Sequence, residues 1–160
     1  MKFYIKQKVF SFGDSFNIYD ENGREAFYVQ GRVFSLGKKL NLYDNQSNEL
    51  IYMEQKLFKL MPTYDIYASN RLMATIKKNF TFFSQSFTIN SAYGSYEVEG
   101  DFTGHDFDIV KNGTTFCASL CKRWLSFGDS YEIEIAPEEN IPFMLAMVIV
   151  IDQTIHEDNN

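Results

Sequence analysis

The sequence predicts a mainly β protein: a twelve-stranded closed antiparallel β-barrel that encloses a hydrophobic C-terminal α-helix. Three observations lead to this fold class. Aromatic residues make up 17% of the 160-residue chain, with 16 Phe and 10 Tyr, and this composition favours strands. A motif of alternating apolar and polar residues recurs along the chain. An uninterrupted apolar segment, 141–151, lies near the C-terminus.

The recurring motif places the strands in order. Residues 10–20 align with residues 34–44, and a third copy begins at Phe58. The pentapeptide Ser-Phe-Gly-Asp-Ser occurs at 11–15 and again at 126–130. Each unit contains a turn, an alternating strand, a polar turn and a second strand, so six units predict twelve strands. Because the connections are short, strands that follow each other in sequence are expected to pair antiparallel.

We expect strands at about 3–9, 15–19, 25–31, 39–43, 50–56, 63–67, 72–77, 86–89, 94–99, 106–110, 114–121 and 130–135.

The apolar segment 141–151 has no polar face, so as a helix it must be buried on every side. A helix of this length spans about 16 Å, roughly half of a bilayer core, which argues against a transmembrane segment. A barrel of twelve strands leaves an interior void unless something fills it. We therefore expect a central helix at about 141–155, with Pro142 in its first turn, and a single domain over 1–160 with strands over about 3–135.

Composition excludes several classes of partner and compartment. The formal charge is −6, from 15 Lys and Arg against 21 Asp and Glu, and no cationic run exceeds two residues, which argues against nucleic acid. The N-terminal residues lack the apolar region of a secretory signal, so we expect a cytoplasmic protein. Cys117 and Cys121 should lie on one face of one strand, about 13 Å apart, and therefore remain reduced thiols rather than form a disulfide.

No arrangement of residues predicts catalysis, a metal ion or a cofactor. The two histidines are His105 and His156, and no phosphate-binding loop, nucleophile elbow or Ser/His/Asp arrangement is found. Asp101, His105, Asp106 and Asp108 form an acidic cluster, but their spacing is not that of an EF-hand loop. We expect this cluster to be a solvated hairpin turn and the protein not to be an enzyme.

Basic pairs at strand ends are the candidate binding residues. Turns from successive hairpins gather at the rims of a closed barrel, where lysines could form a patch for an anionic headgroup. The alternative is that these lysines only protect exposed strand ends. Lys56 and Lys59 lie near a further strand end. The predicted patch consists of Lys38, Lys39, Lys77, Lys78, Lys122 and Arg123.

Two segments carry a family resemblance. The segment Lys-Arg-Trp-Leu-Ser-Phe-Gly-Asp-Ser-Tyr-Glu-Ile at 122–133, together with a terminal apolar helix ending Ile-Val-Ile-Asp-Gln at 149–153, resembles the LURP-one-related family. That family is grouped with tubby C-terminal domains and phospholipid scramblases, which share a twelve-stranded barrel threaded by a hydrophobic C-terminal helix. The resemblance covers essentially the whole chain and implies this fold. It carries over no site residue.

The same resemblance implies a class of function. Tubby domains bind phosphoinositides through basic residues on the barrel exterior, and scramblases act at membranes. We therefore expect a non-enzymatic binding or scaffold domain, cytoplasmic and peripheral at the membrane, with a lipid headgroup or another protein as its partner. Two alternatives stay open: a carrier of a small apolar ligand, which the helix opposes by occupying the lumen, and a protein–protein interaction module with no lipid role. The oligomeric state is not predicted.

Overall fold

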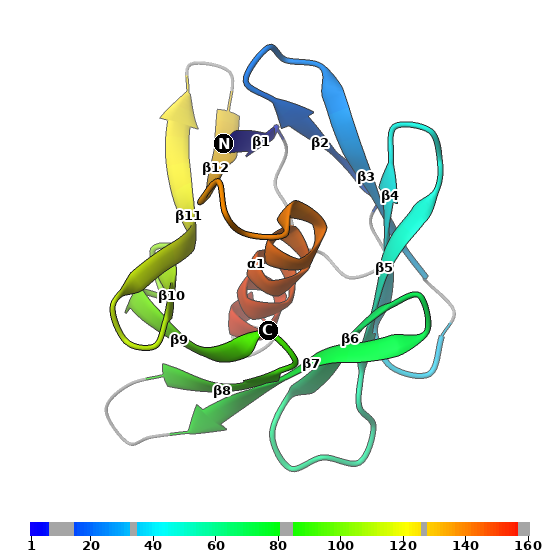
Figure 1. Cartoon of the computed structure of the whole chain (residues 1–160), viewed down its shortest axis with the longest axis vertical. Coiled ribbons are helices and arrows are strands. Elements are labelled where there is room, and N and C mark those ends of the chain that lie inside the picture. Colours follow the sequence, from blue (N-terminus) through cyan, green and yellow to red (C-terminus); the bar gives the residue numbers. More distant parts are fainter. Residues whose placement is uncertain (7–14, 33–34, 81–84, 126–127, 157–160) are drawn as a thin grey trace.

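The computed structural model describes residues 1–6, 15–32, 35–80, 85–125 and 128–156. These residues form twelve strands and one helix, and the strands close into a single antiparallel barrel around the helix (Figure 1). Each strand pairs with its neighbour in sequence, and β1 pairs with β12 to complete the ring, with Phe3 opposite Ile133. The predicted fold class is confirmed.

The elements are β1 (Lys2–Ile5), β2 (Phe16–Asp20), β3 (Glu25–Gly31), β4 (Lys39–Asp44), β5 (Glu49–Gln55), β6 (Thr63–Ala68), β7 (Arg71–Phe80), β8 (Gln85–Ser91), β9 (Gly94–Asp101), β10 (Asp106–Lys111), β11 (Thr115–Leu125), β12 (Gly128–Ile135) and α1 (Ile141–His156).

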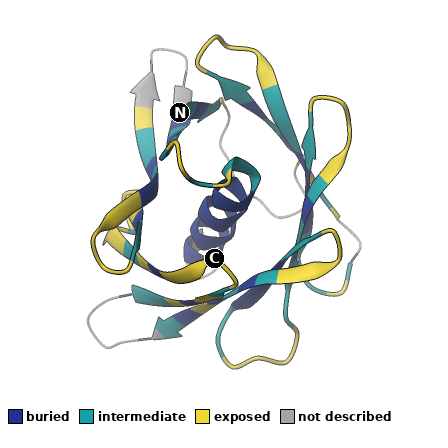
Figure 2. Ribbon diagram, in the orientation of Figure 1, coloured by how far each residue is buried: buried dark blue, intermediate teal, exposed yellow. Residues whose placement is uncertain are grey.

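The helix α1 fills the lumen, and Figure 2 shows it buried along most of its length. Asn140 caps its first turn, since the side-chain Oδ1 accepts a hydrogen bond from the backbone N–H of Phe143 at 3.0 Å. From Met144 to Ile151 every residue has an exposed fraction of 0%. The strands of the barrel therefore cover this apolar helix on all sides, as expected. Among the described residues, no helix combines the length and apolar character that crossing a membrane requires.

Strand residues alternate between the lumen and the exterior. In β6, Tyr64 and Ile66 are almost completely buried, and in β7 the same is true of Ala74 and Ile76. Within the described residues, register shifts interrupt four of the strand pairs, and such bulges increase the local twist and bend that closure of a barrel needs. They fall between Ile18 and Tyr19, Leu42 and Tyr43, Ile66 and Tyr67, and Ile109 and Val110.

The barrel has two different ends. We call the end where α1 begins the helix-start end; there the Phe143 ring packs against Tyr93 of the β8–β9 turn, with ring centroids 4.9 Å apart. We call the other the helix-exit end; it includes the β3–β4, β5–β6 and β9–β10 connections. There His105 Nδ1 lies 2.8 Å from the buried carboxylate oxygen Oδ1 of Asp152 in α1. The two ends therefore carry separate sets of turns.

Candidate functional site

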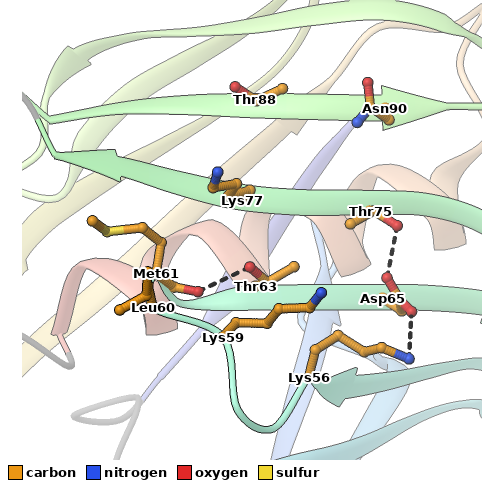
Figure 3. Close-up of a pocket in the computed structure, with 10 residues that line it drawn as sticks. All are labelled: Lys56, Lys59, Leu60, Met61, Thr63, Asp65, Thr75, Lys77, Thr88 and Asn90. Atoms are coloured by element: carbon orange, nitrogen blue, oxygen red, sulfur yellow. Dashed lines mark hydrogen bonds and ion pairs between the residues drawn. The ribbon is translucent and has the colours of Figure 1, made fainter.

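A cavity of about 560 Å³ lies on the barrel exterior over β6, β7 and the β5–β6 connection (Figure 3). We call it the exterior groove. Its lining combines three lysines with threonine hydroxyls, one carboxylate and two apolar side chains. The lysines are Lys56, Lys59 and Lys77, and the apolar residues are Leu60 and Met61.

Strand alternation aims the groove residues outward. Thr63 of β6 is paired in register with Lys77 of β7, and Lys77 is paired with Thr88 of β8. Neighbouring side chains along each strand point to the opposite face. The residues that line the groove therefore lie on the outer face of three consecutive strands, with α1 behind the sheet in Figure 3.

A hydrogen-bonded carboxylate holds the wall of the groove. Thr75 Oγ1 donates to Asp65 Oδ1 at 2.6 Å, Tyr67 Oη donates to Oδ2 at 3.1 Å, and Lys56 Nζ lies 3.0 Å from Oδ2. Burial acts to raise the pKa of Asp65, but the hydrogen bonds from Thr75, Lys56 and Tyr67 outweigh it, so the pKa lies below the usual 3.8. Asp65 is thus ionised at neutral pH and forms an ion pair with Lys56.

The other two lysines of the groove have no such partner. Both Lys59 and Lys77 are exposed, and within the described part of the chain the ammonium group of neither makes a hydrogen bond or an ion pair. Figure 3 shows the Lys59 side chain extending over β6 beside Thr63, while Lys77 lies on the adjacent strand β7. Two unpaired ammonium groups next to hydroxyl groups suit an anion that carries several oxygens, such as a phosphate.

The structure divides the six predicted patch residues among four places. Lys77 lies in the groove. Lys38 and Lys39 are half-buried at the start of β4, beside the base of the β5–β6 connection, where the Gln55 N–H donates to the Lys38 carbonyl at 2.8 Å.

The remaining basic pair of the prediction lies away from the groove. Lys122 and Arg123 are on β11, which is separated from β7 by three strands in the barrel order. Arg123 Nη2 is 3.1 Å from Glu132 Oε1. These residues are therefore not brought together with Lys77.

The assignment of Lys78 to an exterior patch is corrected by the structure. Its exposed fraction is 0%, and its Nζ donates to the Thr154 carbonyl oxygen at 3.5 Å, at the C-terminal end of α1. Adjacent residues of a strand point to opposite faces, so Lys77 and Lys78 cannot both face solvent. A cation at a helix C-terminus is stabilised by the carbonyl groups and the helix dipole, which accounts for its position inside the barrel.

The predicted patch omitted Lys56 and Lys59, although they line the groove. The sequence signal was the segment 55–62, Gln-Lys-Leu-Phe-Lys-Leu-Met-Pro, in which two lysines alternate with apolar residues and no acid occurs. Lys56 and Lys59 are not adjacent to each other, unlike the basic pairs of the predicted patch. The pairing of β6 with β7, in which Thr63 lies opposite Lys77, brings this connection beside β7.

The acidic cluster does not converge on one point. Asp101 Oδ1 accepts hydrogen bonds from the N–H groups of Thr103 and Gly104, at 3.0 and 3.2 Å, and so closes its own turn. The His105 side chain hydrogen-bonds Asp152 of α1, outside the turn. Among the described residues no group of three potential metal-ligating side chains is found.

The two cysteines are not on one face, contrary to the expectation. The bulge pairs Ile109 with Ala118 and Val110 with Phe116, so Cys117 is the extra residue and the alternation shifts there. Cys117 and Ala118 are both completely buried. Cys121 is half-buried, and its Sγ lies 3.7 Å from Asp106 Oδ2. Burial, together with Glu139, raises the pKa of Cys117 to about 12, so it stays a thiol at neutral pH.

Comparisons with known proteins agree with this architecture. A sequence model of a family described as LURP-one-related matches residues 1–152. YxjI, an uncharacterised protein of Bacillus subtilis (strain 168), is 37% identical over 160 residues, which cover 100% of this chain and 97% of that protein. The X-ray structure of a protein from Arabidopsis thaliana matches with a TM-score of 0.70 over 99% of this chain and 91% of that chain. At 16% identity, the last likeness shows a shared fold.

Proposed function

The chain belongs to the LURP-one-related family, and on that premise we propose that it is a non-enzymatic binding domain that holds the phosphate-bearing headgroup of an anionic membrane lipid in the exterior groove. The observation that carries the proposal is the pair of exposed, unpaired lysines, Lys59 and Lys77, in one cavity of the described structure. A phosphoinositide-type headgroup is the ligand class that we favour. The protein is then peripheral, at the cytoplasmic face of the membrane.

The size and chemistry of the groove support a headgroup ligand. A volume of about 560 Å³ falls in the range of small-molecule sites, roughly 300–1,000 Å³. Lys59 and Lys77 supply positive charge, and Thr88 supplies a hydroxyl beside them. Lys56 is already paired with Asp65, so its main effect is to fix the wall rather than to hold the ligand.

The lumen gives less support to an apolar-ligand carrier. In small barrels that carry ligands, the interior is the binding site. Here α1 occupies the lumen, and its residues from Met144 to Ile151 are fully buried against the strands. A protein partner without any lipid is the remaining alternative, and vesicle binding separates it from our proposal.

The test is binding of the full chain to vesicles of phosphatidylcholine alone, with phosphatidylserine, or with phosphatidylinositol 4,5-bisphosphate. Lys59→Gln/Lys77→Gln should weaken binding to anionic vesicles by about 30-fold, because each basic residue near such a surface contributes about 1 kcal/mol. Arg24→Gln/Arg71→Gln is the matched control, since it removes two exposed cations at the helix-start end. The parent should bind anionic vesicles more weakly as salt rises.

Two results would contradict the proposal. If the parent binds no vesicle of any composition, the lipid function is wrong and a protein partner takes its place. If the two double variants lose affinity equally, net charge rather than the exterior groove determines binding.

A further inference from the structure

Two neighbouring connections at the helix-exit end expose large apolar side chains to solvent. Leu36 of the β3–β4 connection is 84% exposed. In the β5–β6 connection Leu57 is 43%, Phe58 102% and Leu60 100% exposed. We call these four residues the apolar tip. Single exposed apolar residues are common, but several on adjacent connections indicate an interaction surface.

The two connections form one unit. A Cβ placed on Gly37 would lie 2.9 Å from Leu57 Cδ2, so the backbone of one connection packs directly on a side chain of the other. The Gln55 N–H donates to the Lys38 carbonyl at 2.8 Å and ties their bases together. Phe58 adopts φ +59°, a conformation that non-glycine residues rarely adopt, and its side chain is fully exposed. The two connections therefore present the tip to solvent from one joined backbone structure.

The charges around the tip specify the kind of partner. Segments 32–39 and 55–62, which contain the tip, have five Lys and Arg and no Asp or Glu, although the whole chain has a net charge of −6. The turn residues 20–24 and 44–48, at the helix-start end, have three acids and one cation. An anionic surface therefore attracts the β3–β4 and β5–β6 connections and repels the turns 20–24 and 44–48, whereas the β9–β10 connection of the helix-exit end is flanked by Asp101 and Asp106 and adds no attraction.

We propose that the apolar tip inserts among the lipids of an anionic bilayer, so that the barrel docks with its helix-exit end on the membrane. This inference rests on the proposed lipid function and adds the orientation and the inserting residues. Leu60 belongs both to the tip and to the wall of the exterior groove, so insertion brings Lys59 and Lys77 to the depth of the headgroups. Apolar side chains interleaved with lysines match the membrane interface, where stems are buried and ammonium groups meet phosphates.

The first experiment measures depth. Phe58→Trp is bound to anionic vesicles that contain phosphatidylcholine brominated on its acyl chains, and its fluorescence is compared with that of the parent, whose single tryptophan, Trp124, provides the background. We expect a blue shift and added quenching that the parent lacks. Tyr93→Trp is the control, because Tyr93 is 44% exposed at the helix-start end and should gain no quenching.

The second experiment measures affinity. Phe58→Ser and Leu60→Ser should each weaken binding to anionic vesicles by about tenfold or more, since burial of a large apolar side chain is worth that much. Leu72→Ser removes a 52% exposed leucine at the helix-start end and should leave binding unchanged. Thermal melts of all variants verify that the fold is retained, as expected for exposed positions.

The outcomes separate the two proposals. If Phe58→Trp gains no quenching and Phe58→Ser binds like the parent while Lys59→Gln/Lys77→Gln is impaired, the insertion is refuted and the headgroup function stands. If insertion occurs equally on neutral vesicles and the lysines have no effect, the inserting residues stand, whereas the preference for an anionic bilayer and the headgroup function both fail. If the parent binds no vesicle but self-associates through the tip, so that Leu60→Ser abolishes the dimer, both lipid proposals are wrong.

Discussion

Val148 lies near the middle of α1, and none of its surface is exposed. Val148→Asp therefore tests directly whether the central helix holds the barrel together. The substitution places a carboxyl group in a lumen lined by Ile, Leu, Val, Met and aromatic side chains. An isolated buried carboxylate is strongly disfavoured, so the group must either take up a proton or open the structure to water.

The magnitude follows from the burial. Protonating a carboxyl group of ordinary pKa near 4 at pH 7 costs about 4 kcal/mol. The protonated group still lacks hydrogen-bond partners, which costs about 1–3 kcal/mol, and the packing of valine is lost as well, at about 1.5–3 kcal/mol. These costs exceed about 6 kcal/mol together, whereas a domain of ordinary stability has roughly 5–15 kcal/mol in all. Val148→Asp should not fold, or should melt near room temperature.

A graded series keeps the test informative. Val148→Ala removes two methyl groups, so it should cost about 2 kcal/mol and lower the melting temperature by about 4–8 °C. Leu72→Asp introduces the same carboxyl group at a 52% exposed strand position, where a cost of about 1 kcal/mol or less is expected. Far-UV circular dichroism melts and urea titrations provide both readouts. A Val148→Asp protein that melts within a few degrees of the parent would refute the conclusion that the buried helix α1 stabilises the barrel.

Two further substitutions test the strand pairing and the groove wall. Gly100→Ala should lower the free energy of unfolding by about 2–4 kcal/mol in urea titrations, because φ is +139° and the new Cβ would lie 2.7 Å from Phe107 Cα. Gly23→Ala is the control: its Cβ would have nothing within 4 Å, so it should cost about half as much. Equal costs would contradict the β9–β10 register. Asp65→Asn should cost about 1–3 kcal/mol at pH 7 through its lost charge-assisted hydrogen bonds. Since the folded pKa of Asp65 lies below its ordinary value, this carboxylate stabilises the fold above about pH 4 and stops doing so as the pH falls through the folded pKa. The difference in unfolding free energy between the parent and Asp65→Asn should therefore shrink in acid. A difference that stays constant with pH would contradict this role of Asp65.

The barrel could be predicted because its pattern is local. The repeated alternation, such as Phe16 and Ile18 around Asn17, records which side chains face the lumen, and short connections leave one simple pairing of neighbours. The helix could be predicted because 141–151 lacks any polar face. Some boundaries agreed closely, as with the strand expected at 63–67 and found at Thr63–Ala68. Others did not: the strand expected at 114–121 is found at Thr115–Leu125, and residues 7–9 of the strand expected at 3–9 lie outside the described residues.

The site could not be predicted in the same way because it depends on the register between neighbouring strands. Lys59 lies in the β5–β6 connection and Lys77 in β7, and the pairing of Thr63 with Lys77 brings them to one cavity. The bulge at Ile109 and Val110 is equally invisible in the alternation, and it moved Cys117 to the face opposite to Cys121. The register between neighbouring strands and single-residue shifts within it are the two features that the alternation leaves open.

Lys77 and Lys78 show how closely function and stability are interleaved in this fold. They are neighbours in β7, yet one faces the groove and the other reaches the last carbonyl groups of α1 from inside the barrel. A residue that faces outward can change without altering the packing of the lumen, so the headgroup affinity that we propose for the groove and the stability of the fold can vary independently at positions next to each other. The alternation that makes the barrel recognisable in the sequence therefore also directs every second side chain outward and leaves the outer face available for binding. The helix α1 supports that face from inside the barrel.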